Sequence, residues 1–168
     1  MNNSQIIILC FIGFILLLFY YIFIIKDSKH DYLTHPFWFN MNKDVVKMLS
    51  FFQLFAVIGF ILTISIWIIN PPKQGIVLGN NLFYILLLFL ISAAIWPVAT
   101  YYKIHWLVIS SLIITAISSI LLLAGTIEEN PNDIKWYKVL GMLCLCLVTV
   151  LGDGVLWNAN YIKYNSNL

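Results

Sequence analysis

The stretch IIILCFIGFILLLFYYIFII, from Ile6 to Ile25, decides the fold class of this chain. It carries no charged residue, and it is as long as the roughly 20 apolar residues that a helix needs to cross a hydrocarbon layer about 30 Å thick. The residues before it, MNNSQ, include no basic side chain, and no small-residue cleavage site follows it. We therefore interpret this run as a retained membrane anchor and not as a cleaved signal peptide.

The composition of the whole chain favours the same class. Of the 168 residues, 62% are hydrophobic and only 10% are charged, whereas a soluble domain is typically about 45–50% apolar and about 25% charged. The charged and other polar residues of this chain are too few to cover the surface of a water-soluble protein, so we predict an integral membrane protein. The net charge of +2 comes without a basic cluster, which argues against a nucleic-acid partner. The expected partners are membrane lipids, together with other membrane proteins or further copies of this chain in a homo-oligomer.

Apolar segments of membrane-spanning length recur along the chain. They lie at about residues 6–25, 46–69, 82–102, 106–124 and 137–157. Short polar connections separate them, and we find neither an internal repeat nor a low-complexity linker. We therefore predict an all-α integral membrane protein, a five-transmembrane-helix bundle with short loops that forms one transmembrane domain over residues 1–168. Only a few residues around Lys103–His105 join the third and fourth spans, which should therefore be antiparallel neighbours.

The distribution of lysines predicts an orientation. With the N-terminus outside, the inner side would hold Lys26, Lys29, Lys43, Lys47, Lys103 and Lys163, and the outer side would hold Lys73, Lys135 and Lys138. Cytoplasmic loops of membrane proteins carry an excess of basic residues. We therefore expect a multi-pass protein with its N-terminus outside and its C-terminus in the cytoplasm.

The longest connection, residues 26–44, contains the aromatic sequence YLTHPFWFNMN. Trp and Tyr prefer the headgroup zone of a membrane, so we expect a wetted interfacial loop here. The loop also holds four residues with metal-binding side chains, Asp27, His30, Asp31 and His35. Their spacing matches no standard ligand motif, and we expect no metal site.

Small and polar residues mark the faces on which the spans should meet. In the fourth span Ser111, Thr115 and Ser119 recur every fourth residue, which predicts a helix–helix seam, with a polar pore lining as the alternative. In the second span Gln53 should face the bundle, because an unpaired amide in lipid is costly. In the third span Pro97 should kink the helix.

The fifth span contains the only acidic residue inside an apolar run. In LGDGVLWNANYIKY, from Leu151 to Tyr164, Asp153 stands between two glycines and one turn before Trp157. A carboxylate at the bilayer centre costs about 2.5–3.5 kcal/mol on insertion scales, and less near the edge. Other polar residues are expected at a depth similar to that of Asp153 or on its helix face. Together with it they form a candidate intramembrane polar site: Asp153, Gln53, His105, Lys103 and Thr149.

Two hypotheses explain this aspartate. It could pin the fifth helix to its neighbours, through ion pairs with Lys47 or Lys103 or through hydrogen bonds with Gln53 or His105. Alternatively, it could bind a proton, a cation or a basic ligand.

The sequence contains no HExxH, GxSxG, P-loop or potassium-filter motif, so we expect no catalytic residue and no cofactor. The leading hypothesis is a non-catalytic multi-pass membrane subunit or scaffold that packs with other membrane proteins or with itself. The alternative is a carrier, channel or receptor for a small molecule, lipid or proton, using a polar site around Gln53 and Asp153, with Trp96 and Trp106 as walls. A membrane-embedded enzyme acting on lipid through His105 and Asp153 is a third hypothesis.

Overall fold

The computed structural model describes residues 3–20, 31–69, 72, 77–79, 81–128 and 136–166. Its main elements are α1 (Asn3–Tyr20), α2 (Lys43–Ile69), α3 (Leu82–Tyr101), α4 (His105–Glu128), α5 (Trp136–Leu147), the π-helical segment η4 (Val148–Trp157) and α6 (Asn158–Ser166). Two short 3₁₀ turns, η2 (Tyr32–Thr34) and η3 (Pro36–Trp38), precede α2. The described residues form no strand, so the all-α prediction is confirmed for them. Residues 21–25 of the first expected span lie outside the described residues.

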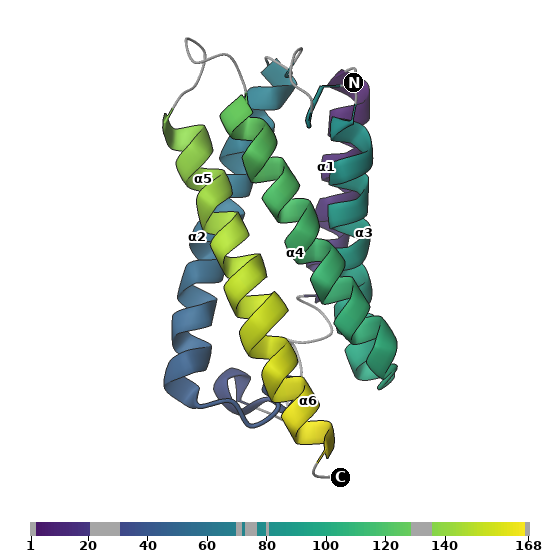
Figure 1. Cartoon of the computed structure of the whole chain (residues 1–168), viewed down its shortest axis with the longest axis vertical. Helices are drawn as coiled ribbons and strands as arrows, with labels where there is room; N and C mark the ends of the chain where they lie inside the picture. Colours follow the sequence, from purple (N-terminus) through teal and green to yellow (C-terminus); the bar gives the residue numbers. More distant parts are fainter. Residues whose placement is uncertain are drawn as a thin grey trace.

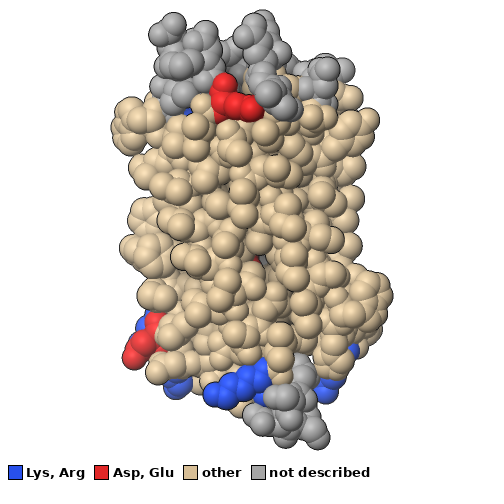
Figure 2. Space-filling view, viewed as in Figure 1, with Lys and Arg blue, Asp and Glu red and all other residues tan. Residues whose placement is uncertain are grey.

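Among the described residues, four helical rods are long and apolar enough to cross a membrane: α2, α3, α4 and the continuous rod Trp136–Tyr164. A shorter apolar helical stretch, Ser4–Leu16, lies within α1. The rods run side by side along the long axis of the molecule (Figure 1). Charged residues gather at the two ends of the face seen in Figure 2, with a broad uncharged band between them. This is the surface of a multi-pass membrane protein.

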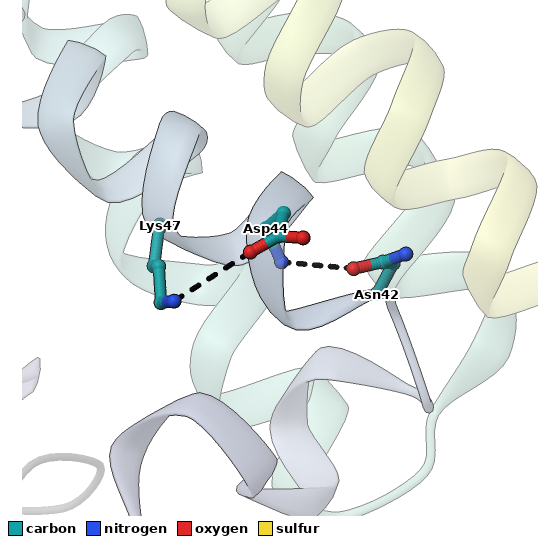
Figure 3. A network of polar contacts seen from close by, with 3 residues as sticks. All are labelled: Asn42, Asp44 and Lys47. Carbon is teal, nitrogen blue, oxygen red and sulfur yellow. Dashed lines mark hydrogen bonds and ion pairs between the residues drawn. The ribbon is translucent and has the colours of Figure 1, made fainter.

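A side-chain cap fixes the start of α2, and two other helices extend further than expected. The α2 helix already begins at Lys43, because the Asn42 side-chain oxygen accepts a hydrogen bond of 2.9 Å from the Asp44 backbone N–H (Figure 3). The α4 helix continues past the expected boundary to Glu128, and the last rod continues through α6 to Ser166. Both helices thus extend beyond the expected membrane spans, which end at about 124 and 157.

The α3 and α4 helices form the most extensive helix pair, and they are antiparallel neighbours as expected (Figure 1). A tight turn joins them, in which Lys103 adopts a left-handed conformation with a φ of 56°. The Ile104 backbone N–H reaches back to the Ala99 carbonyl at 2.9 Å and so closes the end of α3. The α4 helix therefore follows directly along the helix before it.

The α2 and α5 helices cross where two glycines meet. A Cβ placed on Gly59 would lie 2.6 Å from the Cα of Gly141, well inside ordinary contact distance. The Thr63 hydroxyl lies in the same crossing, at 3.0 Å from the Gly59 carbonyl and 3.5 Å from the Lys138 carbonyl. Only residues without a side chain allow this approach, which is how helices pack closely in lipid.

The serine–threonine stripe of α4 contacts helices on two sides. The Thr115 hydroxyl donates to the Ser92 hydroxyl of α3 at 2.8 Å. One turn along, the Thr149 hydroxyl of η4 donates to the Ser119 hydroxyl at 2.5 Å. Ser111, the third stripe residue, is buried and bonds within its own helix. Two of the three stripe residues thus bond to side chains of neighbouring helices in this chain, and Thr115 also lines a cavity.

The aromatic loop before α2 differs from expectation. Phe37 and Trp38 are only 7% and 2% exposed, and the Trp38 indole N–H donates to the Tyr32 carbonyl at 2.9 Å. The Phe37 ring lies against Trp96 and Trp157, with centroid separations of 5.0 and 5.4 Å. The prediction of a wetted interfacial loop is wrong for these side chains, because large rings gain more from packing into the end of the bundle than from lying on its surface. Asp27 and His30 lie outside the described residues.

Candidate functional site

A large cavity, partly open to the outside, lies between the helices of the bundle. Its volume is about 1570 Å³, and side chains from α1, α2, α3, η4 and α6 line it. The lining is mostly apolar and includes Gly13, Phe60 and Phe89 from three different helices. Small-molecule sites commonly occupy about 300–1,000 Å³ and combine apolar walls with a few polar groups. The cavity is therefore large enough for an extended apolar molecule.

Four of the five residues of the candidate polar site line this one cavity: Gln53, Lys103, Thr149 and Asp153. The Gly152 backbone brings η4 close to α2, since a Cβ at that glycine would lie 3.1 Å from Leu49 Cδ2. Gln53 stands one helical turn after Leu49, so its amide comes alongside the segment that carries Asp153. The structure thus places residues that are 100 positions apart in the sequence on the walls of one cavity.

Asp153 is half-buried and faces the interior cavity. Among the described residues, its carboxylate has no hydrogen bond and no ion pair. The same holds for the Gln53 amide, which is also half-buried. Two half-buried polar side chains without partners among the described residues thus line the same cavity.

The residues expected to pin Asp153 are engaged elsewhere or lie at another depth. Lys47 pairs with Asp44 at 3.5 Å on the exposed surface (Figure 3). His105 Nδ1 and the Tyr161 hydroxyl share a hydrogen bond of 2.6 Å, and His105 is not among the described residues that line the cavity. Lys103 lines the cavity from the exposed turn between α3 and α4. The structure thus does not contain the pins that the sequence suggested.

The backbone around Asp153 is a π-helix. The η4 segment extends over Val148–Trp157, and the Thr149 carbonyl lies 3.3 Å from where a Cβ of Gly154 would be. A π-helix has more residues per turn than an α-helix, so it rotates the side chains that follow its start. Gly154 has no side chain to crowd this wider coil, and Gly152 leaves room for Leu49 of α2. Such π segments are frequent at functional sites, and here the segment carries the carboxylate toward the cavity.

Aromatic rings line the cavity at the end of the bundle where α6 lies, which we call the α6 end. They are Phe37, Phe39, Trp96, Tyr161 and Tyr164. Phe39 and Asn40 adopt left-handed conformations with φ of 47° and 55°, and this reversal directs the Phe39 ring against Trp157 and Tyr161, each at a centroid distance of 4.9 Å. Trp157, which contacts four of these rings, follows Asp153 by about one turn along the chain.

Sequence reasoning identified only part of this aromatic lining. Trp96 lines the cavity, as the carrier hypothesis assumed, but Trp106 is 72% exposed and is not one of its described lining residues. Trp157, Tyr161 and Tyr164 follow one another at four- and three-residue steps, so they share a helix face. That periodicity was the available signal for two of the missed lining residues.

Comparisons with known proteins give no match: no family model, no curated protein and no solved structure resembles this chain. The function is therefore argued from the site alone.

Proposed function

We propose that this chain is a membrane carrier or receptor that binds an amphipathic small molecule in its interior cavity. Gln53 and Asp153 would hold the polar group of that molecule, and the apolar lining would hold its hydrocarbon part. One observation carries the proposal: two polar side chains on facing helices, without partners among the described residues, line a single apolar cavity of about 1570 Å³.

The polar groups must supply most of the selectivity. A hydrocarbon chain that leaves water gains roughly 0.8 kcal/mol for each methylene that is buried. A chain that leaves lipid gains almost nothing, because lipid tails are as apolar as the cavity walls. A ligand taken from the bilayer is therefore distinguished from bulk lipid mainly by its head, and the groups that meet the head are the amide and the carboxylate.

We further propose that the chain crosses the membrane five times, with α1 as the first crossing and the N-terminus outside. The start of α1 and the end of α6 lie at opposite ends of the bundle, which suits an odd number of crossings (Figure 1). The excess of lysines on the proposed inner side supports this orientation.

The scaffold hypothesis rests on short loops, on the absence of catalytic motifs and on several small-residue seams. One of these seams, at Thr115 and Ser119, pairs with residues of this same chain. A packing role with other proteins stays a prediction. The enzyme hypothesis has no support from the geometry, since His105 pairs with Tyr161 and is not among the cavity-lining residues.

Native mass spectrometry of the purified protein tests the proposed function. The protein is extracted in maltoside micelles, and its mass is measured after collisional removal of the micelle. We expect the wild-type chain to retain a small molecule in stoichiometric amount. Filling the cavity with Ala94→Phe should remove that mass, whereas Ile91→Phe, a matched change at a site that is 44% exposed and outside the described lining of the cavity, should keep it.

The proposal fails if the wild-type chain carries no additional small mass. It also fails if the Ala94→Phe variant retains as much as the Ile91→Phe variant, since the ligand would then lie elsewhere. Co-purification of stoichiometric protein subunits without a small ligand would instead favour the scaffold.

A further inference from the structure

We propose that the cavity selects amphiphiles with a positively charged head, an amine or a quaternary ammonium, and that Asp153 binds this charge. The inference rests on the proposed function and names the chemical class of its ligand. It starts from the carboxylate and the residues around it.

An ionised carboxylate only accepts hydrogen bonds, and it is stable in an apolar interior only beside donors or positive charge. None of the described residues supplies Asp153 with either. Asp153 lines the cavity, so the space that its carboxylate faces is open to a bound molecule. A cationic head provides the missing charge, and it provides donors where it carries N–H groups.

The aromatic cluster next to Asp153 suits the same head. Trp157 stands one turn after the aspartate and contacts Trp96 and Phe37 at 5.0 and 5.4 Å between ring centroids. Both of these partners line the cavity. The faces of aromatic rings attract cations, and a carboxylate combined with such rings is a recurrent way to bind ammonium groups.

Lys103 lines the same cavity but stands too far along it to neutralise Asp153. The Lys103 turn lies beside His105, which bonds to Tyr161. Tyr161 follows Asp153 by eight residues along one continuous rod, which corresponds to about 12 Å at the rise of an α-helix. An ammonium in contact with the carboxylate therefore interacts with it far more strongly than with the lysine.

Negatively charged heads are disfavoured because the Asp153 carboxylate is itself negative. A sulfate or carboxylate head would bring like charge to the unpaired Asp153 side chain, and a neutral head could only donate hydrogen bonds to it. The expected order of affinity is therefore cationic, then neutral, then anionic. Replacing the carboxylate by an amide removes the negative charge that attracts the cationic head, so it should weaken cation binding about ten-fold or more.

Three amphiphiles with the same tail test the inference: dodecyltrimethylammonium, tetraethylene glycol monododecyl ether and dodecyl sulfate. Each is titrated, below its micellar concentration, onto the full chain in lipid nanodiscs, and the one-to-one complex is counted by native mass spectrometry. The variants are Asp153→Asn and, as a matched control, Asp44→Asn, which neutralises an exposed carboxylate at the start of α2.

We expect wild type and Asp44→Asn to bind dodecyltrimethylammonium at least ten-fold more tightly than the neutral ether. Asp153→Asn should lose this preference while it still binds the ether with unchanged affinity, which also shows that the variant is folded. Should Asp153→Asn fail to fold, the order of the three affinities in wild type decides the question.

The two proposals fail in different ways. If none of the amphiphiles forms a one-to-one complex with wild type, the binding function itself is wrong. If the ether or the sulfate binds as tightly as the ammonium, or if Asp153→Asn keeps the cationic preference, the cavity binds amphiphiles but the assignment of the head is wrong.

Discussion

The substitution Gly59→Ala tests the packing of the bundle at the crossing of α2 and α5. The added methyl carbon would lie 2.6 Å from the Cα of Gly141 and 2.7 Å from its carbonyl oxygen, whereas ordinary contact begins at 3.4 Å. Both groups are backbone and cannot rotate away, so the two helices must separate by about 0.8 Å or more. Such overpacking costs roughly 1–3 kcal/mol. Alanine offsets about 0.5–1 kcal/mol of this cost, because it is the better helix former.

The matched control is Gly13→Ala in α1. There the new carbon meets only the Cδ2 atom at the end of the Leu90 side chain, at 2.9 Å, which a change of rotamer relieves. We therefore expect the control to be neutral or slightly more stable than wild type. The Gly59→Ala variant should fall below it by about 2 kcal/mol in free energy of unfolding.

Unfolding by sodium dodecyl sulfate in maltoside micelles, followed by far-ultraviolet circular dichroism, measures this difference. A double variant, Gly59→Ala with Gly141→Ala, adds a sharper criterion. The methyl group of Gly59→Ala already separates the helices. Adding Gly141→Ala should therefore lower the free energy of unfolding clearly less in this variant than it does in wild type. If Gly59→Ala is as stable as Gly13→Ala, or if the two glycines behave independently, the close crossing does not exist.

Two further predictions concern the seams and the topology. Replacing Thr149 by Val removes the hydroxyl that donates to Ser119, and it should lower the free energy of unfolding by about 0.6 kcal/mol, with about 1.7 kcal/mol as the upper limit. The control in the same detergent titration is Thr100→Val, which removes a hydrogen bond within one helix only. Equal losses of stability in the two variants would contradict the seam. With the native cysteines replaced by alanine, the single cysteines Ser4→Cys and Lys163→Cys should react with an impermeant maleimide from opposite sides of sealed vesicles, and labelling of both from one side would rule out five crossings.

The sequence could predict the spans because hydrocarbon thickness imposes a length that hydropathy reveals directly. The α4 stripe was predictable for a related reason, since a four-residue repeat of small residues is itself a packing signal. The crossing at Gly59 and Gly141 was not predictable in the same way. Single glycines in two separate apolar runs do not indicate which helix each will meet, and only the three-dimensional arrangement pairs them.

The candidate site was predicted in its members but not in its form. Gln53 and Asp153 were predicted as site residues because polar groups are costly in lipid. In the structure both side chains line one cavity. Hydropathy alone does not report a π-helical coil, so the rotation of Asp153 toward the cavity could not be anticipated. The Phe37 ring was predicted to lie in the headgroup zone because an aromatic loop next to a span usually lies there. Its burial against Trp96 depends on two 3₁₀ turns, which a simple sequence pattern does not predict.

Photolabelling tests most directly the claim that an amphiphile occupies the cavity. The probe is a dodecyl ammonium with a diazirine on its tail, applied to the protein in nanodiscs and mapped by peptide mass spectrometry. We predict adducts at interior residues such as Phe60 and Phe89, which line the cavity, and we predict that excess dodecyltrimethylammonium suppresses them. Adducts concentrated on the outer residues Ile58 and Ile91, which are 46% and 44% exposed, or adducts that the competitor leaves unchanged, would contradict the account.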